Sequence, residues 1–392
     1  MNMENRFFLQ PAEAPSYEGV SNKRNLLSGL ISTHTAEKPF PDISGCKIAL
    51  VGVEESRSAT ANPLVKGGPD LIRNYLYNLH QGAFKVQIAD LGNIISGNTI
   101  EDTYVALTEV MVELLENNVI PVVLGGSQDL TWACYKAYEK LKRTINIVAV
   151  DKVFDLGTED NTLTPESYLK KIIVQQPNFL FNYSNIGYQT YFENQDTIKL
   201  MENMFFDVCR LGTARSDLAE NEPTIRNADL LTFDIGAIRA SDAPGHAMAS
   251  PNGFFGDEAC QLARYAGLSE NLTSIGFFEF NPKFDPRGLT AQLLAQMIWY
   301  FIDGFCNRKN ENPALQADNF IKYYVPVSSS DDGITFYRSK YTDRWWMEIG
   351  IRANIKPQFQ RHNFVPCSLK DYNTASADDL PDRWWKACQK LM

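Results

Sequence analysis

The sequence predicts an α/β protein of three layers, α/β/α, with a mainly parallel sheet between two layers of helices. Short β-branched runs alternate along the chain with segments of helical periodicity, which is the pattern of strand–helix–strand units. The strand runs are continuously apolar, as is typical of strands buried on both faces of a parallel sheet. Apolar residues make up 44% of the 392-residue chain, enough for a large core.

The predicted elements begin after an irregular, Pro-, Ser- and Asn-rich extension over residues 1–44. A first strand is predicted over 47–53, and Pro69 after two glycines starts a helix over 69–80. The next helix spans 100–117, where apolar residues recur at helical spacing and Thr99 with Asp102 resembles a capping box. Later strands are predicted over 119–126, 144–151, 228–234 and 272–280, and an amphipathic helix over 289–305.

Residues 307–392 differ from this pattern, because they are rich in aromatic and turn-forming residues. Residues 320–341 predict a hairpin or a strand pair. The tetrapeptide DRWW occurs at 343–346 and again at 382–385. Either both copies start amphipathic helices that dock on the core, or they form an aromatic surface for a partner, since Trp and Arg are enriched at interfaces. The residues of that surface would be Trp345, Trp346, Trp384 and Trp385. The sequence therefore predicts a domain over 45–306 followed by a C-terminal extension over 307–392 that packs on it.

Charge and cysteine usage limit the class of protein. The 37 Lys and Arg against 47 Asp and Glu give a net charge of −10, which argues against nucleic-acid and anionic-membrane partners. The seven cysteines are widely spread and show no metal-binding or disulfide pattern, as in reduced cytosolic proteins. The N-terminus lacks a signal-peptide pattern, and the apolar stretch 291–302 is too short to span a bilayer. We expect a soluble cytoplasmic protein without membrane insertion.

Polar side chains follow four of the predicted strands. They are Gln128, Asp151 with Asp155, Asp234, and Glu279. In a parallel sheet the carboxyl ends of strands share one edge, where ligands bind. Carboxylates gathered there repel one another and require a cation, either a metal, a guanidinium substrate, or an Arg or Lys of the protein. Alternatively, each Asp serves only as a helix cap or turn former.

These segments resemble the ureohydrolases, a family of arginases, agmatinases and formimidoylglutamases. The similarity runs over residues 46–306, roughly two thirds of the chain, and rests on four motifs in order: LGGSQDLT (124–131), DKVFD (151–155), TFDIGAIRASDAPG (232–245), and EFNPKFD (279–285) followed by Thr290-Ala291. GGPDLIR (67–73) echoes a further family segment, and residues 161–192 are most similar to the formimidoylglutamase branch. The resemblance implies an arginase-like fold and a binuclear manganese centre whose bridging hydroxide attacks a guanidinium or formimino carbon.

Three of the six metal-ligand positions implied by this resemblance have changed. The two family histidines are Gln128 and Val153 here, and one family Asp is Gly236. The retained carboxylates are Asp151, Asp155 and Asp234. With Gln128 they would form an all-oxygen site for one Mn²⁺, Mg²⁺ or Ca²⁺ ion. The second ion would keep only two bridging carboxylates, so we expect either no metal cofactor or a single ion.

Other changed positions bring new charges near the motifs. Lys152 replaces a small residue and Arg239 replaces an Asp, so either cation could neutralise the carboxylates. The alternation of side chains along a strand would point Lys152 away from Asp151, which favours Arg239. Glu279 matches the position that holds the guanidinium or formimino group, and His246 lies in the substrate-loop region as a candidate ligand or acid–base group.

The lost ligands favour a non-catalytic homologue with a structural, regulatory or protein-partner role. We expect such a protein to bind a protein partner or to form a homo-oligomer. A first alternative is a single-metal hydrolase of a non-peptide C–N bond in a formimino or guanidino substrate. A second alternative is a sensor that binds a guanidino compound or an amino acid through Glu279 without reacting it.

Overall fold

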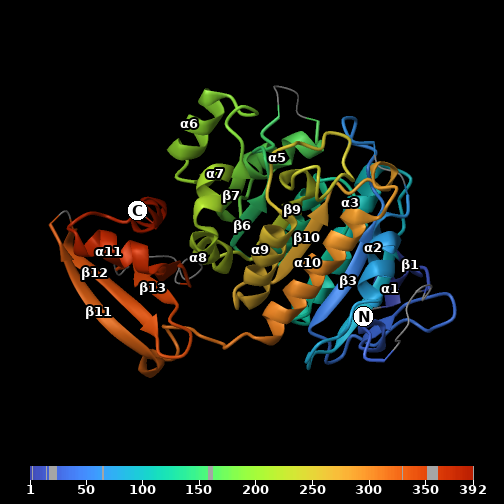
Figure 1. The fold of residues 1–392 in the computed structure, drawn as a ribbon, viewed down its shortest axis with the longest axis horizontal. Coiled ribbons are helices and arrows are strands. Elements are labelled where there is room, and N and C mark those ends of the chain that lie inside the picture. Colours follow the sequence, from blue (N-terminus) through green and yellow to red (C-terminus); the bar gives the residue numbers. More distant parts are fainter. Residues whose placement is uncertain are drawn as a thin grey trace.

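A ten-stranded sheet forms the centre of the molecule (Figure 1). The computed structural model describes residues 1–392 except 2, 15, 17–23, 64–65, 158–161, 329, 351–360 and 392. The strand order is β1-β4-β3-β5-β10-β9-β6-β7-β8, with β2 beside β4. Only β1 runs antiparallel among the described pairings of this sheet. The strands are β1 (Leu9–Gln10), β2 (Ile31–Thr33), β3 (Ile48–Val53), β4 (Ile88–Ile94), β5 (Ile120–Leu124), β6 (Ile145–Val150), β7 (Leu180–Tyr188), β8 (Asp207–Arg210), β9 (Leu230–Asp234) and β10 (Ser274–Phe278).

Helices cover both faces of this sheet, so the predicted three-layer α/β fold is confirmed. On one face lie α2 (Gly68–Tyr77), α8 (Glu222–Arg226), α9 (Gly256–Leu268) and α10 (Leu289–Cys306). On the other lie α3 (Ile100–Glu116), α4 (Leu130–Lys140), α5 (Tyr168–Val174) and α6 (Gln195–Asn203). The remaining short helices of this part are α1 (Met3–Arg6) and α7 (Leu211–Ser216). Successive residues of β3 alternate between the two cores: Leu50 faces the first and Val51 the second.

The strands and helices predicted from residue 47 onward are present, with ends shifted by up to three residues. The predicted strands correspond to β3, β5, β6, β9 and β10, and the helices to α2, α3 and α10. The capping box of α3 is confirmed, because Thr99 Oγ1 accepts from Asp102 N at 3.2 Å and Asp102 Oδ2 accepts from Thr99 N at 2.8 Å. The expectation of a wholly irregular stretch over 1–44 is corrected, since β1 and β2 both pair with β4. None of the helices in the described ranges is long and apolar enough to cross a membrane.

The C-terminal residues build a second, antiparallel sheet beside the first (Figure 1). Its strands are β11 (Phe320–Val327), β12 (Ser330–Ser339), β13 (Trp345–Glu348) and β14 (Phe364–Cys367), with helices α11 (Leu369–Ser376) and α12 (Asp382–Leu391). The predicted hairpin over 320–341 is confirmed by the pairing of β11 with β12. We call residues 317–392 the C-terminal unit. It has an aromatic core of its own, in which Trp345 packs with Tyr323 and Tyr372.

The two DRWW segments take different structures. The first leads into β13 rather than a helix, and the second begins α12. Trp345 and Trp346 are buried and Trp384 is partly buried in the C-terminal unit, where its indole donates to the Glu348 carbonyl at 3.2 Å. Only Trp385 of these four remains largely accessible, at 46% exposure. The interpretation of the four residues as one partner surface is therefore corrected, because buried side chains cannot contact a partner.

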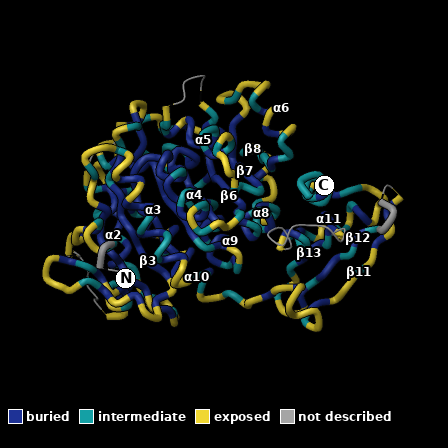
Figure 2. The backbone as a smooth tube through the Cα atoms, turned by 180° about the vertical axis from the view of Figure 1, so that it is seen from behind, coloured by how far each residue is buried: buried dark blue, intermediate teal, exposed yellow. Residues whose placement is uncertain are grey.

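A buried arginine of α8 attaches the C-terminal unit to the first domain. The Arg226 guanidinium donates to the carbonyls of Trp345 at 3.0 Å and Cys367 at 3.2 Å, and lies 4.2 Å from the Trp346 ring. A second arginine, Arg361, pairs with Asp229, with its Nη1 2.6 Å from Oδ1. In the tube drawing, α8 lies on the side of the first domain that is nearest the C-terminal unit (Figure 2). Charge-assisted contacts of this kind hold the extension against the sheet.

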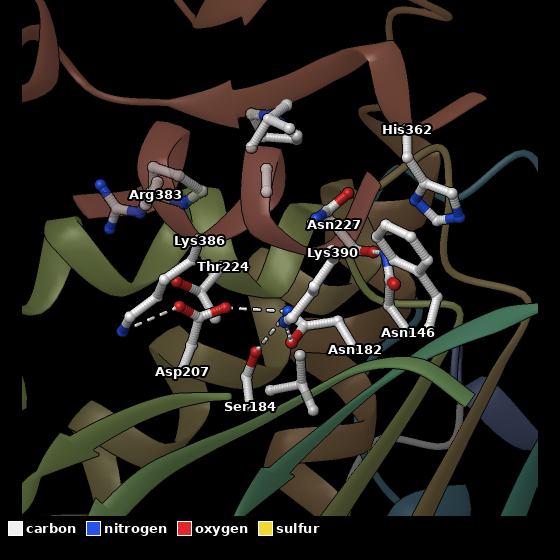
Figure 3. A pocket seen from close by; sticks show the side chains of 16 residues that line it. Asn146, Asn182, Ser184, Asp207, Thr224, Asn227, His362, Arg383, Lys386 and Lys390 are labelled. Atoms are coloured by element: carbon white, nitrogen blue, oxygen red, sulfur yellow. Dashed lines mark hydrogen bonds and ion pairs between the residues drawn. The ribbon is translucent and has the colours of Figure 1, made fainter. Parts of the chain in front are cut away.

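Lysines of α12 reach down to the sheet at the same junction (Figure 3). Lys386 Nζ lies 3.3 Å from Asp207 Oδ1, and Lys390 donates to Asn182 Oδ1. Although burial opposes it, the charges of Lys390 and Lys386 hold the pKa of Asp207 below its usual value. These groups line a cavity of about 40 Å³ with Ser184. That volume suits a water molecule rather than a substrate, since one water takes about 30 Å³ of liquid.

The buried Lys390 predicts a pH-dependent stability. Burial lowers the pKa of Lys390 from 10.5 to about 8. Between pH 8 and 10.5 the unfolded chain therefore binds the proton more tightly, so this residue makes the free energy of unfolding rise with pH. We expect Lys390→Met to lose that rise in urea titrations at pH 7 to 10.5, whereas Lys386→Met, the matched control, retains it. Parallel pH profiles for wild type and Lys390→Met would contradict the assignment.

Candidate active site

The polar residues predicted at strand ends meet at one edge of the sheet. Strands β5, β10, β9 and β6 are consecutive neighbours, and each supplies its residue just beyond its carboxyl end or, for Asp234, as its last residue. Phe278 pairs with Asp234 in the register of β10 and β9, so Glu279 follows directly beside that carboxylate. We call this cluster of side chains at the sheet edge the crevice. Its residues are deeply buried, with exposures from 0 to 8%: Gln128, Asp151, Asp155, Asp234, His246 and Glu279.

Glu279 is fixed by donors from two loops. Its Oε1 accepts from the Gln128 backbone N–H at 2.8 Å, and its Oε2 accepts from Asn62 Nδ2 at 2.8 Å. The backbone of Glu279 adopts a left-handed conformation, with φ of 66°, which a residue other than glycine seldom takes. Burial, then the charge of Asp234, raises the pKa of Glu279 well above its usual value. A cationic amidinium group would reverse that effect by pairing with the carboxylate.

The three aspartates lie together with too few donors to satisfy them. Asp151 Oδ1 accepts from the Val153 N–H at 3.2 Å, and Asp234 Oδ1 accepts from the Gly236 N–H at 2.5 Å. The Oδ2 atoms of Asp151 and Asp155 are buried and have no hydrogen-bond partner among the described residues. Burial raises the pKa of all three carboxyls, with further elevation of Asp151 by Asp234 and of Asp155 by Asp151. Unpartnered acceptors in this number are costly without a cation.

Gln128 presents an amide oxygen to the same crevice. Its Nε2 donates to Thr232 Oγ1 at 2.7 Å, which fixes which end of the amide carries the oxygen. The Oε1 atom is buried and accepts no hydrogen bond of 3.5 Å or less from the described residues, although the Tyr168 hydroxyl interacts with this side chain. An amide oxygen held in this way is a suitable ligand for a hard cation.

The two candidate neutralising cations lie in different places, and the preference for Arg239 is corrected. Arg239 Nε pairs with Asp242 Oδ1 at 3.0 Å, and its guanidinium stacks 3.8 Å from the Phe255 ring. Lys152 lies nearer to Asp234, whose pKa is raised by burial and lowered by the Lys152 charge. Among the described residues, however, the Lys152 Nζ forms no ion pair within 4.0 Å and donates to the Met248 carbonyl at 2.9 Å. The expected alternation fails because β6 ends at Val150, so Lys152 is no longer in extended strand geometry.

His246 faces Glu279 as a neutral ring. Its Nδ1 accepts from the Met248 N–H at 2.8 Å, so the ring hydrogen is assigned to Nε2, which lies 3.7 Å from Glu279 Oε2. Burial, then the charge of Lys152, lowers the pKa of His246 to about 3. The ring is therefore a hydrogen-bond donor toward the crevice rather than a charged acid or a base.

Three further residues of the crevice escaped the sequence analysis. Asn62 bridges the site, since its Oδ1 accepts from the Ala247 N–H at 3.0 Å while its Nδ2 binds Glu279. Tyr168 and Tyr183 are fully buried, and no hydrogen bond of 3.5 Å or less among the described residues reaches either hydroxyl. The two hydroxyls interact with each other, and that of Tyr168 also with the Gln128 side chain. Burial raises the pKa of both, as do the charges of Asp155 and Asp151. No local pattern marks these tyrosines, because their proximity to the carboxylates depends on the packing of α5 on β7.

The positions where the resemblance places metal ligands do not keep the donors of two ions in this chain. Val153 and Gly236 offer no ligand atoms at the positions where the resemblance places ligands of a second ion. Within the described ranges, no three His, Cys, Asp or Glu side chains are arranged to hold an ion by themselves. The buried side-chain oxygens of Gln128, Asp151 and Asp155 are of the type that Mn²⁺, Mg²⁺ or Ca²⁺ accepts.

Comparison with known proteins agrees with this architecture. The arginase family model matches residues 46–303, which leaves the C-terminal unit outside it. A formimidoylglutamase of Bacillus subtilis is 23% identical over 299 residues, covering 71% of this chain and 91% of that protein. The crystal structure of the Bacillus subtilis formimidoylglutamase gives a TM-score of 0.64 at 19% identity, over 78% of this chain and 99% of that one. The crystal structure of Trypanosoma cruzi formiminoglutamase with Mn²⁺ gives a TM-score of 0.63 at 17% identity, over 72% of this chain and 99% of that one. The structure of a proclavaminate amidino hydrolase of Streptomyces clavuligerus gives a TM-score of 0.59 at 17% identity, over 68% of this chain and 95% of that one.

The crowded carboxylates predict a stability gain when one of them is neutralised. In protein freed of metal with a chelator, we expect Asp155→Asn to raise the free energy of unfolding by roughly 1–2 kcal/mol, because a buried like charge is removed. Added Mn²⁺ should stabilise the wild type, since a ligand that binds only the native state does so, and should stabilise the variant less. Urea unfolding measures both effects.

The matched control is Asp318→Asn, which changes an exposed aspartate of the C-terminal unit. It should neither raise the free energy of unfolding of the metal-free protein nor reduce the stabilisation by Mn²⁺. A loss of stability in metal-free Asp155→Asn would contradict the account of these carboxylates.

Proposed function

Because the chain belongs to the arginase family, we propose that it hydrolyses a non-peptide C–N bond of a linear formimino or guanidino compound with one divalent ion. The observation that carries the proposal is the set of buried, unpartnered oxygens of Gln128, Asp151 and Asp155 beside Glu279. A protein that had lost all chemistry would gain stability by replacing such groups with apolar ones. Their retention supports a crevice that binds a cation and a cationic substrate.

Each residue has a distinct task in the proposed reaction. Gln128, Asp151, Asp155 and Asp234 would hold the ion, which when bound lowers the pKa of a water molecule. Glu279 binds the amidinium and orients its carbon, and Asn62 keeps the Glu279 carboxylate in place. His246 offers its Nε2–H to the same group. In the balanced reaction, the oxygen of the water molecule forms a bond to the amidine carbon. The bond between that carbon and the leaving nitrogen breaks, and the leaving nitrogen takes a proton from the water.

The substrate class follows the relatives, whose names are those of formimidoylglutamases and an amidino hydrolase. A non-catalytic role, which the lost ligand positions favour at first, has less support, because these relatives carry the names of enzymes. A sensor that binds an amidine through Glu279 without reacting it would use the same crevice, and the experiment below separates it from an enzyme.

We expect the purified full chain, loaded with Mn²⁺ and desalted, to retain one ion per chain by elemental analysis. It should hydrolyse at least one of N-formimidoylglutamate, arginine and agmatine. Asp155→Ala should lose both ion and turnover. Glu279→Gln should keep the ion but lose about 30-fold or more in kcat/KM, the equivalent of about 2 kcal/mol for an unpaired buried charge.

Glu311→Gln serves as the matched control, because Glu311 is a buried glutamate remote from the crevice. A bound ion without turnover, together with a rise in melting temperature when these compounds are added, would show that the protein is a sensor and not an enzyme. The absence of both a bound ion and turnover would establish the non-catalytic role.

A further inference from the structure

The C-terminal unit and the first domain have separate apolar cores. The buried apolar side chains of the first domain form two clusters within residues 9–302, and those of the unit form two clusters within residues 320–375. None of these four clusters contains described residues from both bodies. The two bodies therefore meet mainly through polar groups, and an interface of that kind permits relative motion.

The ion pairs across the junction all have the same polarity. Arg344 Nη2 of the unit lies 3.1 Å from Glu222 Oε1 of the first domain. Among the described residues, the other pairs across the junction are Arg344 with Glu270, Arg361 with Asp229, Arg383 with Glu220, and Lys386 with Asp207. Each cation belongs to the unit and each carboxylate to the first domain. Residues 317–392 carry 11 Lys and Arg against 9 Asp and Glu, whereas residues 1–316 carry 26 against 38. A basic unit thus rests on an acidic domain.

Salt ions have access to these pairs. A cleft of about 470 Å³ lies between the two bodies, lined by Asp207 and Glu220 on one side and by Arg383 and Lys386 on the other. The side chain of Arg361 is 41% exposed and that of Lys386 is 27% exposed. Attraction between charges that are partly exposed falls as the salt concentration rises.

Docking also has a cost at its most buried contact. The Arg226 guanidinium is 2% exposed, and its Nη1 has no hydrogen-bond partner among the described residues. A buried donor without an acceptor is unfavourable, and separation of the two bodies would return this group to water. The ion pairs must therefore offset this cost in the docked form.

The linker between α10 and β11 is bound to the first domain up to Lys309 (Figure 1). Arg308 Nε donates to the Gly267 carbonyl at 2.8 Å, and the Lys309 N–H donates to Glu270 Oε1 at 3.1 Å. These contacts fix the first part of the linker to the end of α9 and the turn that follows it.

From Glu311 onward the linker is bound to the unit. The Glu311 carboxylate accepts from the Ser339 hydroxyl and from Thr342 Oγ1, the latter at 2.7 Å. Asn310 lies between the two bound parts, is exposed, and has a left-handed backbone with φ of 53°. A hinge needs only a few residues that absorb a change of backbone angles, and Asn310 has the position of one.

We propose that the C-terminal unit is a hinged arm, which ion pairs hold against the first domain and which moves away as a rigid body about Asn310 when salt weakens those pairs. The arm retains its own aromatic core in both positions. Its release uncovers the amino-terminal parts of β6, β7 and β8. The inference is independent of the proposed hydrolysis, because the crevice lies at the opposite edge of the sheet.

Small-angle X-ray scattering behind a size-exclusion column tests this proposal on the unmodified full chain. We expect the radius of gyration to rise by roughly a tenth between about 0.05 M and about 1 M NaCl, because about a fifth of the chain moves outward. Hydrogen exchange should show unchanged protection of β11, β12 and β13 at both salt concentrations. A constant radius would overturn the proposal, and so would a loss of that protection, since the unit would then unfold rather than move.

Charge variants test the role of the ion pairs. Asp207→Lys should give the larger radius already at low salt, because it places a third positive charge beside Lys386 and Lys390. Adding Lys386→Asp restores a pair of opposite charges and should restore the smaller radius. Glu116→Lys, the matched control at the exposed end of α3, should leave the radius unchanged. A compact Asp207→Lys variant at low salt would show that these pairs do not hold the arm. If that variant does not fold, the salt series on the unmodified chain decides.

Discussion

The burial of several carboxylates at one edge of a parallel sheet is the constraint on which the rest of this structure depends. Parallel strands bring their carboxyl ends to the same edge, and β5, β10, β9 and β6 all end in polar residues there. Water is largely excluded, so neither hydration nor surface counter-ions can screen the charges. The fixed Glu279 carboxylate and the oriented Gln128 amide follow from that burial, because each buried polar group requires a hydrogen-bond partner.

The surrounding loops hold these groups rigidly. Asn62 connects the loop before α2 to Glu279 and to the segment that carries His246. Glu279 and Asp155 keep left-handed backbones that only a well-packed framework sustains. The C-terminal unit contributes elsewhere, since Arg226 and the lysines of α12 attach it at the amino-terminal half of β6, β7 and β8, away from the crevice. Its described residues extend the cover of the sheet and lie away from the site.

Sequence reasoning succeeded where local pattern decides the outcome. Apolar runs and the Thr99 capping box located strands and helices, and the strand ends located the crevice. It failed where contacts between distant segments decide. Tyr168 and Tyr183 reach the carboxylates only through packing of α5 on β7, and Trp345 is buried by an aromatic core that no short motif reveals. The strands within residues 1–44 were missed because two or three residues carry no periodic signal.

Lys152 shows most clearly why such failures occur. The alternation rule holds only while the chain stays extended, and β6 ends two residues before Lys152. The turn then directs the side chain toward Asp234 and Gly236, where the absence of a Cβ leaves room for it. Lys152 and Gly236 are thus more than eighty residues apart in the sequence and neighbours in space. This neighbourhood is set by the turn after β6 and by the loop after β9, so neither segment reveals it alone.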